Sequence, residues 1–214
     1  MPEPLLSNQL RSYLDSLVPE RSSEMVAMEE YAREKSFPII GPAAGYFLYQ
    51  IARMAGVTRV FEMGSGYGYS TAWFARAVKE NGGGEVHHVV WDERLSKMAR
   101  THLSAMGYDS IVNYSVGEAI QVLKQTPGPF DLVFNDIDKE AYPESLAAIN
   151  NKLKPGGILI VDNILWRGKV LDNRDSDDST IAIRELTGLL ASDDRWTTSI
   201  VPIRDGLLLA YKSS

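Results

Sequence analysis

The chain has 214 residues, of which 44% are hydrophobic and 23% are charged, and its formal net charge is −6. This length fits one large domain, and the apolar fraction is sufficient for a sizeable core. The acidic balance gives little positive field to attract phosphates, which argues against broad binding to nucleic acids or anionic membranes. The lack of cysteine excludes disulfides, zinc–cysteine sites and thiol nucleophiles.

The N-terminal stretch MPEPLLSNQLRSYLDSL lacks the basic start and apolar core of a secretory signal. No apolar run approaches the length that crosses a membrane, so we expect a cytoplasmic protein. The chain shows no internal repeat, low-complexity tract or interdomain linker. We therefore expect a single domain over residues 1–214, with residues 1–56 as a helical extension packed on it.

Three segments with helical periodicity open the chain, at about 5–18, 22–35 and 42–56. Ser22 and Ser23 are suited to cap the second segment, and Gly56 closes the third. Beyond them, short apolar strands alternate with helices. Strands are expected at 58–63, 85–91, 111–116, 130–136 and 156–163, and helices at 69–80, 92–106, 118–125 and 143–153. This alternation predicts a parallel sheet with helices on both faces.

The last segments of the chain follow a different order. After a polar loop, a helix is expected at 177–192, followed by strands at 196–203 and 207–213. Only Arg204, Asp205 and Gly206 separate these two strands, and so short a link forces an antiparallel pair. Five strand–helix units closed by an antiparallel hairpin resemble the layout of the class I methyltransferases, an α/β fold with a Rossmann-like sheet.

The stretch FEMGSGYGYST, residues 61–71, joins the first expected strand to its helix through three glycines. Ligands of open α/β sheets bind at the carboxyl ends of the strands, and glycine lets the backbone approach a ligand closely. The dinucleotide fingerprint needs a glycine where Tyr69 stands, so the match to a nicotinamide site is imperfect. A tight turn without a ligand is the alternative. Glu62, a carboxylate inside the strand end, needs polar partners there.

The stretch VFNDIDKEAYPESL, residues 133–146, concentrates charge where a buried strand leaves the sheet. Asp136, Asp138 and Lys139 follow the apolar run within a few residues. The next expected strand ends in the same manner, with Asp162 and Asn163. A strand that ends at an ordinary charged surface explains either stretch taken alone.

Three motifs together resemble the cation-dependent, S-adenosylmethionine-dependent O-methyltransferases of the catechol and caffeoyl-coenzyme A type. They are FEMGSGYGYSTAWFARAV, FDLVFNDIDKEAYPESL and GGILIVDNILWRGKV. The segments DSTIAIREL and IVPIRDGLLLAYK also fit the last helix and final strands of that family. The resemblance covers residues 37–212, and the second and third motifs in combination are its most specific part.

The resemblance implies a divalent-cation site formed by Asp136, Asp162 and Asn163. Carboxyl ends of neighbouring parallel strands lie about 5 Å apart, so these oxygens can converge on one ion. Two carboxylates and an amide oxygen are hard ligands that suit Mg²⁺. The alternative is that both aspartates only cap the segments that follow them. Asp136 and Lys139 are the expected catalytic residues, because Lys139 matches the family lysine that helps to deprotonate the substrate hydroxyl; a solvated surface lysine is the alternative.

The resemblance also implies a site for S-adenosylmethionine. The cofactor-binding residues expected from it are Glu62, Gly64, Gly66, Ser70, Asp92, Glu118 and Asp136. Gly64, Gly66 and Ser70 match positions around the methionine part, and Glu118 matches the position beside the adenine.

One position departs from the family pattern. The acidic residue that usually holds the ribose hydroxyls falls on Val90, which cannot accept those hydrogen bonds. Asp92 lies two residues later, on the same face if the strand continues, and is the expected substitute. A plain helix cap is the alternative role of Asp92.

The implied activity is methyl transfer from S-adenosylmethionine to a hydroxyl of a small aromatic substrate with vicinal hydroxyls. Two adjacent oxygens can chelate the cation, which selects that substrate geometry. Trp166 and Arg167 follow the expected metal ligands and are expected to border the substrate opening. A homodimer is expected from the family, without a nucleic acid or membrane partner.

Three other functions remain open from the sequence. A hydroxylated tRNA base is a possible methyl acceptor in this family architecture, although the acidic balance disfavours it. A nicotinamide-dependent reductase fits the sheet pattern but not the glycine spacing. A non-catalytic nucleoside-binding module is consistent with valine at position 90.

Overall fold

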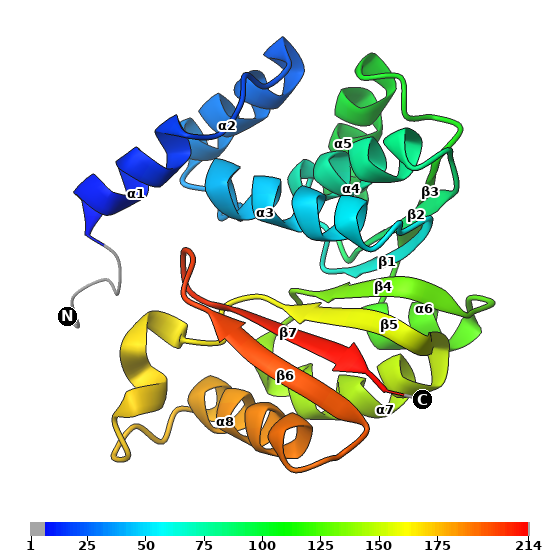
Figure 1. Ribbon diagram of the computed structural model, residues 1–214. Coiled ribbons are helices and arrows are strands. Elements are labelled where there is room, and N and C mark those ends of the chain that lie inside the picture. Colours follow the sequence, from blue (N-terminus) through cyan, green and yellow to red (C-terminus); the bar gives the residue numbers. More distant parts are fainter. Residues whose placement is uncertain (1–6, 214) are drawn as a thin grey trace.

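In the computed structural model, which describes residues 7–213, seven strands form one sheet in the order β3-β2-β1-β4-β5-β7-β6 (Figure 1). The strands are β1 (Arg59–Met63), β2 (Glu85–Val90), β3 (Val112–Val116), β4 (Phe130–Asn135), β5 (Leu153–Val161), β6 (Trp196–Val201) and β7 (Leu207–Lys212). β1 to β5 pair in parallel, whereas β7 pairs antiparallel with β5 and β6. The expected class I methyltransferase layout is therefore confirmed.

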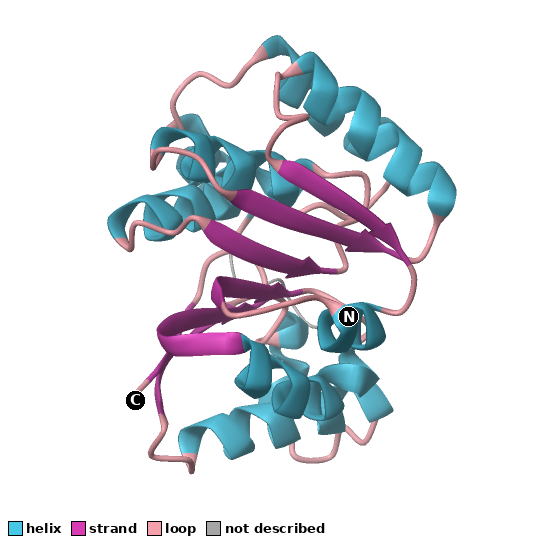
Figure 2. Cartoon of the chain, turned by 90° about the vertical axis from the view of Figure 1, so that its right-hand side faces the viewer, coloured by secondary structure: helices cyan, strands magenta, loops and turns pink. Residues whose placement is uncertain are grey.

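Helices cover both faces of the sheet (Figures 1 and 2). They are α1 (Asn8–Ser16), α2 (Ser23–Lys35), α3 (Gly41–Met54), α4 (Tyr69–Glu80), α5 (Glu93–Ala105), α6 (Ala119–Gln125), α7 (Tyr142–Lys152) and α8 (Asp178–Ala191). The alternation of side chains along the strands produces two cores. Val60 of β1 packs in the core with α2 to α5, and its neighbour Phe61 packs in the core with α6 to α8.

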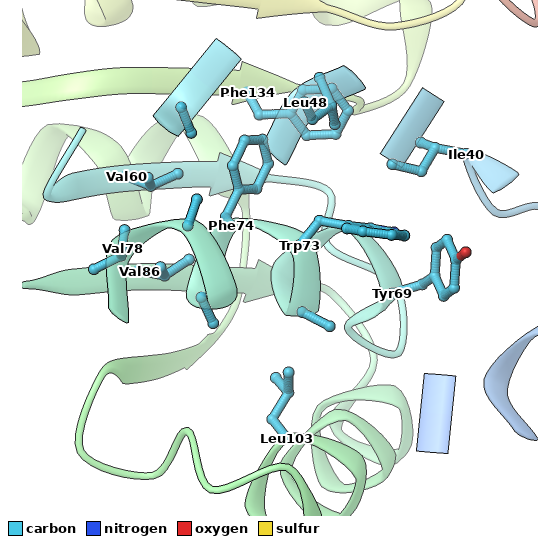
Figure 3. Packing of buried hydrophobic residues seen from close by; sticks show 14 of the residues in the cluster. Ile40, Leu48, Val60, Tyr69, Trp73, Phe74, Val78, Val86, Leu103 and Phe134 are labelled. Atoms are coloured by element: carbon cyan, nitrogen blue, oxygen red, sulfur yellow. The ribbon is translucent and has the colours of Figure 1, made fainter. Parts of the chain in front are cut away.

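The core on the α3–α4 side anchors the helix that follows the glycine loop (Figure 3). Phe74 of α4 lies beside Phe134 of β4, with ring centroids 5.6 Å apart. Trp73 is fully buried, and a Cβ on Gly45 of α3 would lie only 2.2 Å from its indole nitrogen. This close packing of α3 on α4 fixes the start of α4 at the edge of the sheet where the strands end.

Several boundaries differ from the sequence-based expectations. β5 begins at Leu153 rather than at 156, and two 3₁₀ segments, η1 (Lys139–Ala141) and η2 (Trp166–Leu171), follow β4 and β5. The first expected helix was placed from residue 5, and its first two residues lie outside the described part of the chain. Among the described residues, no helix combines the length and apolar character needed to cross a membrane.

Three parallel strands, β1, β4 and β5, are neighbours in the centre of the sheet. Their carboxyl ends bring together the glycine loop, Asp136 and Asp162. The hairpin between β6 and β7 reaches the same side of the molecule as η2 and α1 (Figure 1). Ile164 N donates to Gly206 O at 3.1 Å and Leu165 N to Asp205 O at 2.9 Å, so the hairpin tip is joined to the segment after β5.

Candidate functional site

A cavity of about 730 Å³ opens at the carboxyl ends of the strands. Its lining comes from α1, the glycine loop, the ends of β2, β4 and β5, η2 and the β6–β7 hairpin. The lining residues are Arg11, Phe37, Pro38, Gly64, Gly66, Val89, Val90, Trp91, Gly117, Ala119, Asp136, Ile137, Asp138, Lys139, Asn163, Trp166, Arg167, Arg204 and Asp205. The position agrees with the general location of ligands in open α/β sheets.

The glycine loop forms one wall of this cavity. Gly64 has φ +85°, and a Cβ added there would lie 2.3 Å from the carbonyl oxygen of Asp136. Asp136 N donates to Met63 O at 2.9 Å, so the ends of β1 and β4 are in direct contact. The backbone conformation and the close approach both require glycine at position 64.

Glu62 lies behind the glycine loop rather than in the cavity wall. Its carboxylate is fully buried and accepts hydrogen bonds from Ser70 Oγ and Thr71 Oγ1. Burial raises the pKa of Glu62 to about 7. The polar partners expected for Glu62 are therefore present, and they tie β1 to the first turn of α4. Neither Glu62 nor Ser70 lines the cavity, so their contact with a cofactor stays a prediction.

The two acidic residues expected near the nucleoside cap helices. Asp92 Oδ1 accepts from Arg94 N at 2.6 Å, at the start of α5. Glu118 accepts from Ile120 N and Gln121 N, both at 2.7 Å, at the start of α6. Neither carboxylate lines the cavity. Both side chains satisfy free amides at helix N-termini, which is the usual role of acidic residues at that position.

The end of β2 contributes apolar side chains to the cavity. β2 ends at Val90, so the strand does not continue to Asp92. Val90 itself lines the cavity, together with Val89 and Trp91. Val90 pairs with Val116 of β3 at the last position of β2. The resemblance to the family places its ribose acid at this valine, and that correspondence stays a prediction.

Asp136 and Lys139 form an ion pair at the end of β4. Lys139 Nζ lies 2.8 Å from Asp136 Oδ1 and 3.0 Å from Ile137 O. The side chains are 11% exposed for Lys139 and 26% exposed for Asp136. Burial and the charge of the neighbouring Asp162 raise the pKa of Asp136 to about 6. The expected catalytic pair is therefore assembled in the cavity wall.

Asp162 and Asn163 stand at the end of β5, next to Asp136. Asp162 is fully buried, and its Oδ2 accepts from Arg204 Nη1 at 2.6 Å. Its Oδ1 is also buried and has no hydrogen-bond partner among residues 7–213. Asn163 lines the cavity with φ +58°, and its Nδ2 lies 3.4 Å from Asp205 Oδ2.

These residues are compatible with a divalent cation. No group of three or more His, Cys, Asp or Glu side chains suited to a metal exists within the described chain. The set contains two carboxylates, Asp136 and Asp162, and one amide, Asn163, all of them oxygen ligands of the kind that Mg²⁺ prefers. Within residues 7–213 the buried Oδ1 of Asp162 has no hydrogen-bond partner, and a cation would satisfy it.

Trp166 and Arg167 border the cavity, as expected for residues beside a substrate opening. Both have positive φ, +45° and +53°, and Arg167 N donates to Asp205 Oδ1 at 2.6 Å. The sequence reasoning did not single out Arg11, Arg204 or Asp205. Arg204 and Asp205 could have been recognised in the sequence as two charged residues directly before the glycine of a tight hairpin.

This chain is similar to known O-methyltransferases over most of its length. The O-methyltransferase family model matches residues 18–213. A catechol O-methyltransferase of Niastella koreensis is 29% identical over 209 residues, covering 92% of this chain and 94% of that protein. The O-methyltransferase TomG of Streptomyces achromogenes, solved in complex with SAM, superimposes with a TM-score of 0.87 at 27% identity and covers 97% of each chain.

A further solved relative is the O-methyltransferase of Bacillus cereus in complex with SAH. It has a TM-score of 0.87 and 25% identity, with coverage of 96% of this chain and 97% of that one. The match of the family model extends over nearly all of the sequence. The chain belongs to the O-methyltransferase family.

Proposed function

We propose that this protein transfers a methyl group from S-adenosylmethionine to one hydroxyl of a small aromatic substrate with vicinal hydroxyls, with the help of a divalent cation. The observation that carries the proposal is the placement of Asp136, Lys139 and Asn163 in the wall of one cavity beside the glycine loop. The solved relatives that bind SAM and SAH support the choice of methyl donor.

The cavity offers two chemically distinct parts to its reactants. The glycine loop and the end of β2 provide close backbone approach and apolar side chains, which suit the uncharged adenosine part of the donor. Asp136, Lys139, Trp166 and Arg167 provide charge and an aromatic surface, which suit a hydroxylated aromatic ring. The donor and acceptor would then meet beside Gly64.

Asp136, Asp162 and Asn163 are the residues that would hold the cation. A cation bound there would lower the pKa of a substrate hydroxyl and so ease the loss of its proton. Lys139 pairs with Asp136 in the empty site. Once the cation takes over Asp136, the amine of Lys139 would release its own proton to solvent and would then accept the proton of the hydroxyl. The oxygen then forms a bond to the methyl carbon as the carbon–sulfur bond breaks, and the walls of the cavity align the three atoms.

The proposal can be tested with purified protein, labelled S-adenosylmethionine and a panel of catechols with matched monophenols. We expect methylated product from catechols, little from monophenols, and none when a chelator exceeds the cation. Full turnover in excess chelator would contradict the role of the cation. If calorimetry detected no binding of S-adenosylmethionine, the methyltransferase proposal itself would be wrong. The expected homodimer can be checked by light scattering on the same sample.

Val90→Glu is expected to tighten S-adenosylmethionine binding, because Val90 lines the cavity at the position of the ribose acid. A charge-assisted hydrogen bond contributes roughly 1.5–3 kcal/mol, or about one to two decades in the dissociation constant. Asp92→Ala serves as the comparison. It should remove a helix cap, at a cost of about 1 kcal/mol, and leave cofactor affinity nearly unchanged. If calorimetry shows that Asp92→Ala weakens cofactor binding and Val90→Glu does not tighten it, Asp92 is the residue that holds the ribose.

A further inference from the structure

Arg204 is a positive charge inside the proposed cation site. Its guanidinium Nη1 lies 2.6 Å from Oδ2 of the fully buried Asp162. Arg204 lines the cavity, whereas Asp162 does not. The arginine side chain is 25% exposed, and it contacts both the cavity and the buried carboxylate.

The backbone of the hairpin fixes where the arginine starts. Arg204 has φ +53° in the tight turn between β6 and β7, and Gly206 N closes the turn on Ile203 O at 2.9 Å. The next residue, Asp205, accepts from Leu165 N through its carbonyl oxygen, at 2.9 Å. The β6–β7 hairpin, which is hydrogen-bonded to the segment after β5, thus positions the guanidinium beside Asp162.

The charges of the site balance before any cation arrives. Asp136 and Asp162 contribute two negative charges, and Lys139 and Arg204 contribute two positive charges through direct contacts. A site that is neutral overall attracts a divalent cation less strongly than a site with two unopposed carboxylates. A buried carboxylate is also strongly unfavourable without a counter-charge, so the arginine stabilises the site when the cation is absent.

We propose that Arg204 is the internal counter-ion of Asp162 and competes with the divalent cation for it, which lowers cation affinity and keeps the empty site folded. This inference rests on the proposed cation site and deepens it. It makes cation occupancy, and hence activity, dependent on the concentration of the free cation.

Arg204→Gln is the sharpest test, because glutamine removes the charge and keeps a polar, though shorter, side chain that ends in a hydrogen-bond donor. Titration calorimetry of this variant with Mg²⁺ and with Mn²⁺, in the absence of substrate, should give a dissociation constant about tenfold lower than that of the unaltered protein, or lower still. Arg204→Lys keeps the charge and should remain within a few fold of the unaltered protein. Thermal unfolding should show a larger upward shift with Mg²⁺ in Arg204→Gln than in the unaltered protein.

Arg59→Gln is the matched control. Arg59 is also a partly buried arginine, 2.6 Å from Glu85, but it begins β1 at the opposite end of the strand from the cavity. Its loss should lower stability without changing cation affinity. If Arg204→Gln folds only when Mg²⁺ is present, this also supports the proposal, because the cation then supplies the missing counter-charge.

The outcomes separate this inference from the proposed function. Suppose that the unaltered protein binds the cation and that Arg204→Gln binds it equally or more weakly. Arg204 then only positions Asp162, and the proposed competition with the cation is wrong. The proposed cation site is not affected by this result. If neither protein binds Mg²⁺ or Mn²⁺, the cation site and the inference both fail. Methyl transfer at full rate in chelator would then show that the chemistry does without the cation.

Discussion

Lys139→Met is expected to lower kcat by about 10²- to 10⁴-fold, the usual contribution of one proton-transfer group. Lys139 is the amine in the cavity wall that contacts Asp136, and methionine has a similar length without a basic atom. The affinity for S-adenosylmethionine should change little, because the substitution leaves the glycine loop intact. Steady-state rates at saturating donor, with cofactor affinity measured separately, check both parts.

Two further variants distinguish catalysis by Lys139 from a structural role. Lys139→Arg keeps a positive charge beside Asp136 but cannot readily take up a proton, since arginine stays charged in proteins. Its rate should therefore remain low, and recovery of the rate would show that Lys139 acts only as the counter-ion of Asp136. Lys97→Met removes an exposed lysine, paired with Glu93 on α5, and should leave the rate unchanged.

Local signals were sufficient to predict most elements of the fold. α4 was expected at residues 69–80 and occupies Tyr69–Glu80, because glycines bound the helical pattern at both ends. The antiparallel pair of β6 and β7 followed from the shortness of its link, and it is observed. In both cases the deciding interactions lie within a few residues of each other in the sequence.

The elements that were missed depend on contacts between distant residues. The start of β5 passes through Pro155 and two glycines, which resemble a turn in sequence and form an irregularity between Leu153 and Ile158, the residues that pair with β4. The insertion of β7 between β5 and β6 also has no local signal. Pairing across the sheet decides both features, and a single sequence does not report it.

The candidate site shows the same division. Asp136, Asp162 and Asn163 follow strands, and this position predicted that they would lie at the same edge of the sheet, after the neighbouring strands β4 and β5. Arg204 is 42 residues from Asp162 in the sequence and reaches it only through the hairpin. Asp92 was expected as a substitute for the ribose acid, but β2 ends before it and its carboxylate caps α5. The role as a helix cap was visible in sequence and is observed, whereas a contact of Asp92 with the ribose stays a prediction.

Gly64→Ala is expected to destabilise the protein and to disturb the site together. The change forces a side chain into φ +85°, which costs roughly 1–2 kcal/mol. The new Cβ would also lie 2.3 Å from the carbonyl oxygen of Asp136, and relief of such overpacking typically costs a further 1–3 kcal/mol or so. Because the obstructing atom belongs to the backbone, the end of β4 must move.

That movement connects stability to function. Asp136 would shift away from the glycine loop, and Lys139, paired with it, would shift as well. Activity should therefore fall by at least about tenfold, since a displacement of about 1 Å at reacting groups is enough to lose far more. Urea unfolding and steady-state rates on the same preparation measure the two effects.

Gly56→Ala provides the control that separates backbone strain from the clash. Gly56 also has positive φ, +61°, but a Cβ there would meet nothing within 4 Å. This variant should lose only about 1–2 kcal/mol of unfolding free energy and keep its activity. Equal losses of stability and rate in the two variants would mean that the contact between Gly64 and Asp136 has no special role. A larger loss of stability and rate in Gly64→Ala, with weaker cofactor binding, would support the expected role of this contact. The close backbone contact between the ends of β1 and β4 would then be what holds the donor and acceptor parts of the cavity in their correct relative positions.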